Sequence, residues 1–247
     1  MNKGELAAVI LAAGQGKRMK SDLAKVLHKV CGRPMIRHVV DAARALGPGR
    51  IILIVGHQAE AVIEEMKDEN VEFAIQSERL GTGHAVMQAR PLLEDFDGTI
   101  MVLTGDTPLL RPSTLEGLLK RHLESGASAT VLTTVLDDAS GYGRIIKDAE
   151  GNFVKIVEHR DAGEAERAVR EINSGIFCFK SPDLFHALRG IGRKNSQGEY
   201  YLTDVMAILL SEGKRVLVHR SDDRDELLGI NDIAQLGEAE RLMRENG

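Results

Sequence analysis

Short, largely apolar runs alternate with helical patterns through the first half of this chain, and this alternation constrains its fold more than any other feature. Four of the runs are typical of buried strands: residues 6–11, 51–55, 71–75 and 99–106. Between them, residues 34–46 and 59–67 carry apolar side chains at helical spacing, and so does the segment after Gly83. Repeated strand–helix units of this length predict a mainly parallel sheet with helices on both faces.

The second half of the chain has a different pattern. It contains further strand-like runs separated by turns and one short charged helix: residues 129–136, 143–147, 153–158 and 172–180. We expect these runs to extend the same sheet in a mixed or antiparallel manner and to form a smaller substrate lobe. Ser113 and Glu116 have the spacing of a capping box at a helix start, and residues 232–246 carry apolar side chains on one face of a polar helix.

Composition excludes several classes of protein. The 247 residues suffice for one large α/β domain, and the net charge of −5 argues against a general nucleic-acid binder, which usually has a basic surface. No run of about 18 apolar residues could span a membrane, and the N-terminus is a poor signal peptide, so we expect a soluble cytoplasmic protein. Cys31 and Cys178 lack metal-ligand spacing and adjoin apolar runs, which favours reduced, buried thiols.

The first strand leads into a loop that holds two glycines and several cations, LAAGQGKRMKSDLAK (residues 11–25). The loop lacks the third glycine of a dinucleotide fingerprint, because Met19 stands there, and it also lacks P-loop spacing. Two interpretations remain. The loop is either a solvated charged turn, or a site whose glycines let backbone N–H groups approach an anion, with Arg18 and Lys25 in reach.

Asp106 favours the second interpretation. An aspartate at this point commonly forms a turn, but this one follows a buried strand whose end should lie beside the cationic loop. Ligands of parallel sheets bind at the carboxyl ends of the strands. Magnesium takes one or two protein oxygens together with substrate phosphates. A Mg²⁺ ligand is therefore the more attractive role for this carboxylate.

The glycine loop is similar to the L-A-A-G-x-G-[ST]-R-M…P-K signature of sugar-nucleotide pyrophosphorylases, with Lys17 and Ala24 replacing the usual hydroxyl residue and proline. The similarity continues in order through QSERLGTGHA (76–85), LTGDTPLL (103–110), GYGRII (141–146), IVEHRDA (156–162), EINSGIF (171–177), QGEYYLTD (197–204) and GINDIAQL (229–236). Together these motifs resemble the N-terminal domain of the bacterial bifunctional N-acetylglucosamine-1-phosphate uridylyltransferase/glucosamine-1-phosphate acetyltransferase family. The hexapeptide repeats of that family's acetyltransferase half do not occur in this sequence.

The resemblance implies a Rossmann-like nucleotide-diphospho-sugar transferase fold, with a nucleotidyltransferase domain over residues 1–231 and a C-terminal helix over residues 232–247. It implies a Mg²⁺-dependent, in-line transfer of a uridylyl group from UTP to N-acetylglucosamine 1-phosphate. The products would be UDP-N-acetylglucosamine and pyrophosphate. Neither a nucleic acid nor a membrane is implied as a partner, and the oligomeric state is left open.

The same resemblance implies roles for individual residues. The catalytic groups would be Arg18 and Lys25, which face the phosphates, and Asp106, which holds Mg²⁺ together with Asn231. Gln76, Gly81 and Thr82 would read the uracil edge, and Gly143, Glu158 and Asn173 would line the sugar. The remaining expected substrate contacts are Leu11, Ala12, Ala13, Gly14, Thr104 and Gly105.

Other interpretations stay open. Glu158 fits an exposed strand-end carboxylate, Asn173 a turn or bulge residue and Asn231 the cap of the last helix. The charged stretch SDDRDE (221–226) is typical of a solvated loop, and no histidine is assigned to catalysis, although His84 lies inside a motif. A related nucleotidyltransferase for another sugar 1-phosphate and a non-catalytic sugar-nucleotide-binding module remain alternatives. Loss of Arg18, Lys25 or Asp106 would favour the non-catalytic module, and all three residues are present.

Overall fold

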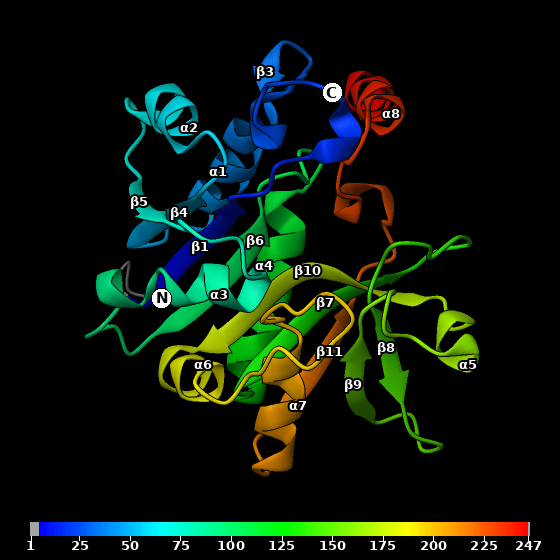
Figure 1. The fold of residues 1–247 in the computed structure, drawn as a ribbon. Helices are drawn as coiled ribbons and strands as arrows, with labels where there is room; N and C mark the ends of the chain where they lie inside the picture. Colours follow the sequence, from blue (N-terminus) through cyan, green and yellow to red (C-terminus); the bar gives the residue numbers. More distant parts are fainter. Residues whose placement is uncertain (1–4, 247) are drawn as a thin grey trace.

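A nine-stranded sheet organises the chain in the computed structural model, which describes residues 5–246 (Figure 1). Seven strands follow one path across it, in the order β11-β7-β10-β6-β1-β4-β5. Only β10 (Glu171–Lys180) runs against its neighbours on this path, and the other pairings along it are parallel. The mainly parallel sheet expected from the sequence is confirmed.

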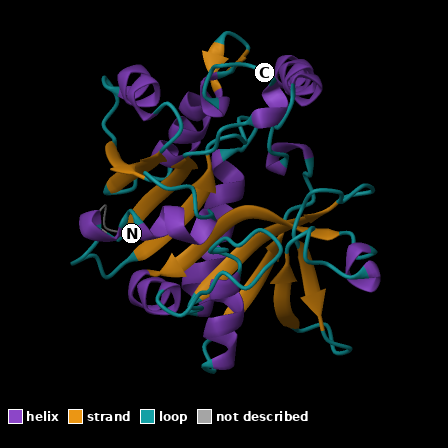
Figure 2. Cartoon of the chain, viewed as in Figure 1, coloured by secondary structure: helices purple, strands orange, loops and turns teal. Residues whose placement is uncertain are grey.

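Helices and strands alternate along the chain much as the apolar runs predict (Figure 2). The strands besides β10 are β1 (Leu6–Ala12), β2 (Lys29–Val30), β3 (Arg33–Pro34), β4 (Arg50–Val55), β5 (Glu72–Ile75), β6 (Thr99–Thr104), β7 (Ala129–Val135), β8 (Arg144–Lys147), β9 (Phe153–Val157) and β11 (Val216–Arg220). The helices are α1 (Met35–Ala45), α2 (Ala59–Met66), α3 (Thr82–Met87), α4 (Pro112–Ser125), α5 (Glu164–Arg167), α6 (Ser181–Leu188), α7 (Asp204–Ser211) and α8 (Ile233–Asn246).

Helices cover both faces of the sheet, as a parallel sheet requires. On β1, Ala8 and Ile10 face a core shared with α1, α2 and α4. The alternate residues Ala7 and Val9 face a second core shared with α3, α6 and α7. Because successive side chains of a strand point to opposite faces, β1 is buried on both sides. No helix among residues 5–246 is long and apolar enough to cross a membrane.

A smaller antiparallel lobe extends from one end of β10. β8 and β9 form an antiparallel pair, and β8 joins β10 through the pairing of Arg144 with Ile172. β10 changes register against β7 between Asn173 and Phe177, where Gly175 takes a positive φ of 81°. The resulting bulge turns the start of β10 towards the small lobe, which Figure 1 shows beside the main sheet.

Three local predictions are wrong. Helix α4 begins at Pro112 and has no side-chain cap of its own, so Ser113 and Glu116 form no capping box. Its start is instead held by Glu226, which is only 2% exposed although it belongs to the stretch predicted to be a solvated loop. Cys31 is exposed in the β2–β3 turn, whereas Cys178 is buried as expected.

Candidate active site

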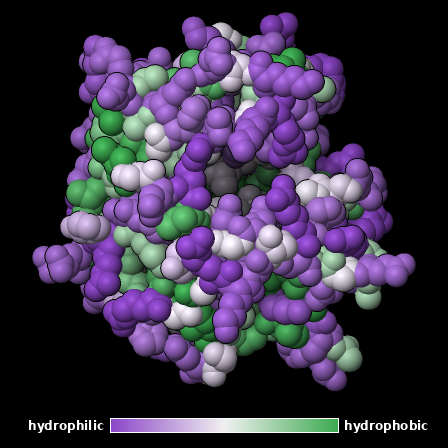
Figure 3. Space-filling view, viewed as in Figure 1, coloured by the Kyte–Doolittle hydropathy of each residue, from purple (hydrophilic) through white to green (hydrophobic). Residues whose placement is uncertain are grey.

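A cleft of about 630 Å³ opens at the edge of the sheet where β1, β5 and β6 end. Figure 3 shows a hollow near the middle of one face of the molecule, rimmed mainly by hydrophilic side chains. Many of the residues predicted to bind substrate line the cleft: Leu11, Ala13, Gly14, Lys25, Gln76, Gly81, Thr82, Thr104 and Asp106. Ala12 and Gly105 are buried beside it, and the backbone N–H of Gly105 donates to the carbonyl of Leu11 at 2.9 Å.

Each of the two glycines in the loop after β1 is needed for a different structural reason. No atom lies within 4 Å of where a Cβ on Gly14 would stand, so its backbone is open to a ligand. Gly16 has a positive φ of 64°, and a Cβ there would stand 2.6 Å from the Cβ of Lys25. The second glycine therefore makes room for the stem of Lys25, which passes directly against the loop.

The segment just before Lys25 is fixed by Gln58. The N–H of Ala24 donates to Gln58 Oε1 at 2.6 Å, and Gln58 Nε2 donates to the carbonyl of Asp22. Gln58 itself has a positive φ of 52° at the start of α2. The loop thus gains a long-range anchor immediately before its lysine.

Lys25, Asp106 and Asn231 meet at one point. The Lys25 ammonium donates to Asp106 Oδ2 and, at 2.7 Å, to Asn231 Oδ1. The N–H of Ile230 donates to the Asp106 carbonyl at 2.9 Å, which fixes the segment carrying Asn231 beside the end of β6. Asn231 does not cap α8, because it is Asp232 that accepts a hydrogen bond from the N–H of Gln235.

The oxygens of Asp106 and Asn231 fit a magnesium ion. Both point at a single cation, the Lys25 ammonium, and so already converge. Among residues 5–246, no three His, Cys, Asp or Glu side chains are grouped as metal ligands. A carboxylate and an amide oxygen match the one or two protein ligands that Mg²⁺ takes when phosphates supply others.

Arg18 lies on an exposed 3-10 turn, η1 (Lys17–Met19), outside the residues that line the cleft. Its guanidinium makes no ion pair within residues 5–246. Burial raises the pKa of the Tyr142 hydroxyl above its usual value, the charge of Asp106 adds to this, and Arg18 opposes it. The structure thus leaves Arg18 outside the lining of the cleft and makes no ion pair between it and Asp106.

The predicted sugar-binding residues meet where β8, β9 and β10 come together. The N–H of Asn173 donates to the Gly143 carbonyl at 2.9 Å, and a Cβ on Gly143 would stand 3.4 Å from Glu158 Oε2. Asn173 is also part of the bulge, because its Oδ1 accepts from the N–H of Gly175 at 2.9 Å. A Cβ on Gly175 would stand 2.9 Å from Thr104 Cγ2, so this lobe directly adjoins the cleft.

Glu158 is a half-buried carboxylate and not an exposed strand end. Its Oε1 accepts a hydrogen bond from the Thr203 hydroxyl at 3.1 Å. Burial raises the pKa of Glu158, and the nearby carboxylates of Asp204 and Asp161 raise it further, although the Thr203 bond opposes them. A carboxyl group held in this way can exchange hydrogen bonds with the hydroxyl groups of a sugar.

Several residues of the site were not assigned from the sequence. Thr203 contacts Glu158, Glu199 lines the cleft, Tyr142 lies near Asp106, and His84 contacts Gln76. All four stand inside the quoted motifs, which were a usable signal. The spacing of the motifs does not show which residues contact one another. Apart from the contact between His84 and Gln76, the contacts join segments that are distant along the chain.

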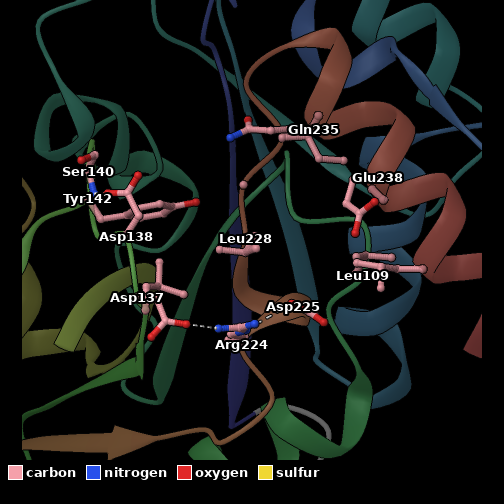
Figure 4. A pocket seen from close by; sticks show the side chains of 15 residues that line it. Leu109, Asp137, Asp138, Ser140, Tyr142, Arg224, Asp225, Leu228, Gln235 and Glu238 are labelled. Carbon is pink, nitrogen blue, oxygen red and sulfur yellow. Dashed lines mark hydrogen bonds and ion pairs between the residues drawn. The ribbon is translucent and has the colours of Figure 1, made fainter. Parts of the chain in front are cut away.

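Figure 4 shows a second cavity, of about 480 Å³. Residues 136–142, the segment 224–230 and helix α8 form its walls, and Arg224 pairs with Asp137 across it at 3.0 Å. Gly229 in its wall also touches Asp106, since a Cβ there would stand 3.4 Å from both carboxylate oxygens. The cavity is therefore separated from the Asp106 side of the cleft by a single turn of chain.

An α/β sheet with a glycine loop, and with a lysine that meets an acid at its carboxyl edge, is the arrangement expected of a nucleotidyltransferase. The family model described as the MobA-like NTP transferase domain matches residues 8–175, which include the glycine loop, Asp106 and the bulge of β10. The chain therefore belongs to the MobA-like NTP transferase family.

The chain is also similar to curated proteins named "Bifunctional protein GlmU". It is 52% identical over 238 residues to the protein of Geobacillus sp. (strain WCH70), which covers 96% of this chain and 52% of the relative. It is 52% identical over 240 residues to that of Brevibacillus brevis, with 97% and 52% covered, and 49% identical over 243 residues to that of Geobacter metallireducens, with 98% and 51% covered. The chain thus spans about half the length of the curated relatives it matches.

Proposed function

We propose that the protein transfers a uridylyl group from UTP to N-acetylglucosamine 1-phosphate, releasing pyrophosphate. The observation that carries this proposal is the meeting of Lys25, Asp106 and Asn231 in the cleft that the glycine loop borders. Its support is the match to GlmU proteins over nearly the whole of this chain, which includes the nucleotide side and the sugar lobe.

The chemistry needs charge neutralisation more than a base. The phosphate of the sugar is already an anion at neutral pH, so its oxygen attacks the α-phosphorus of UTP without prior deprotonation, and pyrophosphate leaves in line. Lys25 lies within the cleft and would place a compact positive charge beside the phosphates, while Arg18, exposed on the same loop, would offer a planar fork to the departing pyrophosphate. These groups supply positioning and electrostatic stabilisation, the main needs of phosphoryl-type transfer.

Magnesium is part of this proposal. Asp106 and Asn231 would hold the ion, which when bound would neutralise charge on the substrate phosphates. Lys25 contacts both oxygens, so the ammonium would have to move from them towards the phosphates when the ion is held.

The sugar would occupy the lobe lined by Gly143, Glu158 and Asn173. A side chain at position 143 would crowd Ile156 at 3.2 Å and Glu158 at 3.4 Å, so the glycine keeps this wall open. The carboxyl of Glu158 would accept hydrogen bonds from sugar hydroxyl groups. The same lobe must discriminate the N-acetylglucosamine form from the N-acetylgalactosamine form.

The test is pyrophosphate release by the purified protein with Mg²⁺, across a panel of four nucleoside triphosphates and three sugar phosphates: N-acetylglucosamine, N-acetylgalactosamine and glucose 1-phosphate. We expect the highest kcat/KM with UTP and N-acetylglucosamine 1-phosphate, and none after chelation of the metal. Faster turnover of another pair would reassign the substrates. Release with no pair, while UTP still binds, would identify a binding module instead.

A further inference from the structure

Gln76 is held by two acceptors just after β5. Its side chain is almost entirely enclosed, and its amide Nε2 lies 3.0 Å from the carbonyl oxygen of Gly81 and 3.1 Å from His84 Nδ1. A carbonyl oxygen can only accept, so the atom facing it must be the amide nitrogen and cannot be the amide oxygen. Both N–H groups of the amide are thereby used.

One tautomer of His84 completes this arrangement. A neutral imidazole has one acceptor nitrogen, and the tautomer with its proton on Nε2 lets Nδ1 accept from the Gln76 amide at 3.1 Å. In that tautomer Gln88 Nε2, which lies 3.2 Å from His84 Nε2, faces a second donor, and it donates instead to the backbone carbonyl of His84 at 2.9 Å.

The other end of the Gln76 amide opens into the cleft. Gln76 lines the cleft, and its Oε1 makes no hydrogen bond within residues 5–246. Nor is this oxygen among the fully enclosed polar atoms that lack a partner, a set limited to His28, His122, Arg144 and His159 in the described part of the chain. The backbone N–H of Gly81, at a positive φ of 109°, likewise makes no hydrogen bond there. Both residues line the cleft, so its wall holds an acceptor and a donor that have no partner within the described residues.

We infer that His84 is a positioning residue that sets the pyrimidine specificity of the cleft, by holding the Gln76 amide with its oxygen towards the base. An acceptor at this point matches the N3–H of uracil, and the neighbouring Gly81 N–H matches a uracil carbonyl. Cytosine presents an acceptor at N3, which would face the Gln76 oxygen without a hydrogen bond. The inference rests on the proposed function in taking a pyrimidine nucleotide as the ligand of this wall.

Calorimetric binding of UTP and of CTP to the whole chain tests this inference without turnover. His84→Leu removes the Nδ1 acceptor, whereas His84→Asn can return an oxygen to nearly the same place. Gln88→Ala is the matched control just after α3, because it removes the amide on the other side of the ring and leaves the Nδ1 contact with Gln76 in place. Melting temperatures of all three variants show whether the fold is intact.

We expect the wild-type protein to bind UTP more tightly than CTP. In His84→Leu the ratio of the two Kd values should fall by about tenfold, the effect of one hydrogen bond, since Gly81 still holds the amide. His84→Asn should keep most of the ratio and Gln88→Ala all of it. An unchanged ratio in His84→Leu, an equal loss in His84→Asn, or no preference in the wild type would overturn the inference. Pyrophosphate release by the wild type tests the proposed function separately.

Discussion

The Lys25 ammonium bridges the two oxygens that the proposed function gives to a metal ion. Lys25→Met removes this internal cation but leaves an apolar stem of similar length. Nucleotide-free Lys25→Met should bind Mn²⁺ roughly tenfold more tightly than the wild type, because the ion no longer displaces a charge-assisted hydrogen bond. Mn²⁺ binding is measured by electron paramagnetic resonance titration.

The Lys25→Met variant should lose catalytic activity although it binds the metal ion more tightly. Pyrophosphate release by Lys25→Met should fall by about 100-fold or more, since a cation beside the phosphates is lost. Lys20→Met is the control, because Lys20 is an exposed lysine of the same loop, and it should change neither quantity. Mn²⁺ affinity that stays at the wild-type value in Lys25→Met would show that lysine and metal do not compete.

Glu158 should make the folded protein less stable as pH rises. Burial raises its pKa above the ordinary value of 4.5, so the folded protein keeps this proton to higher pH than the unfolded chain does. The contribution of the group is full below about pH 4.5 and is lost as pH rises through the raised value. Glu158→Gln should therefore melt about 2–4 °C above the wild type at pH 7 and level with it at pH 4.

A second glutamate provides a control of opposite sign. Glu166 has a lowered pKa, because the N–H of Gly163 and the Lys155 ammonium bind its charged form. Glu166→Gln should therefore lower the melting temperature at pH 7 and not at low pH. Calorimetric scans from pH 4 to 8 measure both variants. A Glu158→Gln protein that melts lower than the wild type at pH 7 would contradict the assigned environment of this carboxyl.

At the scale of elements, Glu226 connects the segment that leads to Asn231 with the start of α4. It belongs to the 3-10 turn η4 (Asp225–Leu227). Its two oxygens accept from the N–H of Arg111 at 3.2 Å, the Thr114 hydroxyl at 2.7 Å and the Ser221 hydroxyl at 3.2 Å. A negative charge at a helix N-terminus also complements the helix dipole.

Glu226→Ala should destabilise the protein by about 1–2 kcal/mol, because it removes the buried acceptor of the Arg111 N–H and the Thr114 hydroxyl at the start of α4. Urea unfolding measures this as a lower midpoint at constant m-value. Asp222→Ala, at an exposed acid of the same stretch, should change the midpoint little. Equal effects of the two substitutions would argue against a capping role for Glu226.

Elements that follow a local rule were predictable, and those set by distant partners were not. The runs that became β1, β4 and β6 are continuous and apolar because both faces of those strands are buried. β11 was not predicted, because its sequence VLVHR is short and mostly half-buried at the edge of the sheet. The predicted capping box failed because the true cap of α4 lies more than 100 residues further along the chain.

The site as a whole shows the same difference between features set by a local rule, which could be predicted, and features set by distant partners, which could not. The ends of neighbouring parallel strands must share an edge, so the glycine loop and Asp106 could be placed together in advance. The partners of Glu158 and the anchor at Gln58 could not be placed, because Thr203 and Asp22 are brought to them only by the packing of separate segments. The roles of the site residues stay predictions.

Helix α8 contacts two segments that lead to the site, one that follows Lys25 and one that precedes Asn231. A substitution in this helix can therefore test how distant packing positions the site. Ala239 of α8 is buried in a cluster with Val30, Met35 and Ile230, and Figure 1 shows α8 beside the β2–β3 hairpin. The carboxylate of Glu240 accepts from the N–H of Cys31 at 2.9 Å in the same contact. The hairpin follows Lys25 in the chain, and Ile230 precedes Asn231.

Ala239→Glu should therefore loosen, from a distance, the side of the cleft that we propose binds the metal ion. An unpaired carboxylate in this cluster should cost about 2–3 kcal/mol and lower the melting temperature by about 5–10 °C. Because the strain falls on the turn before Asn231, KM for the magnesium–UTP complex should rise by about tenfold, with far-UV circular dichroism unchanged. Ala234→Glu is the same substitution at an exposed position of α8 and should leave all three unchanged. A normal KM in a destabilised Ala239→Glu protein would show that the helix supports the fold without positioning Asn231.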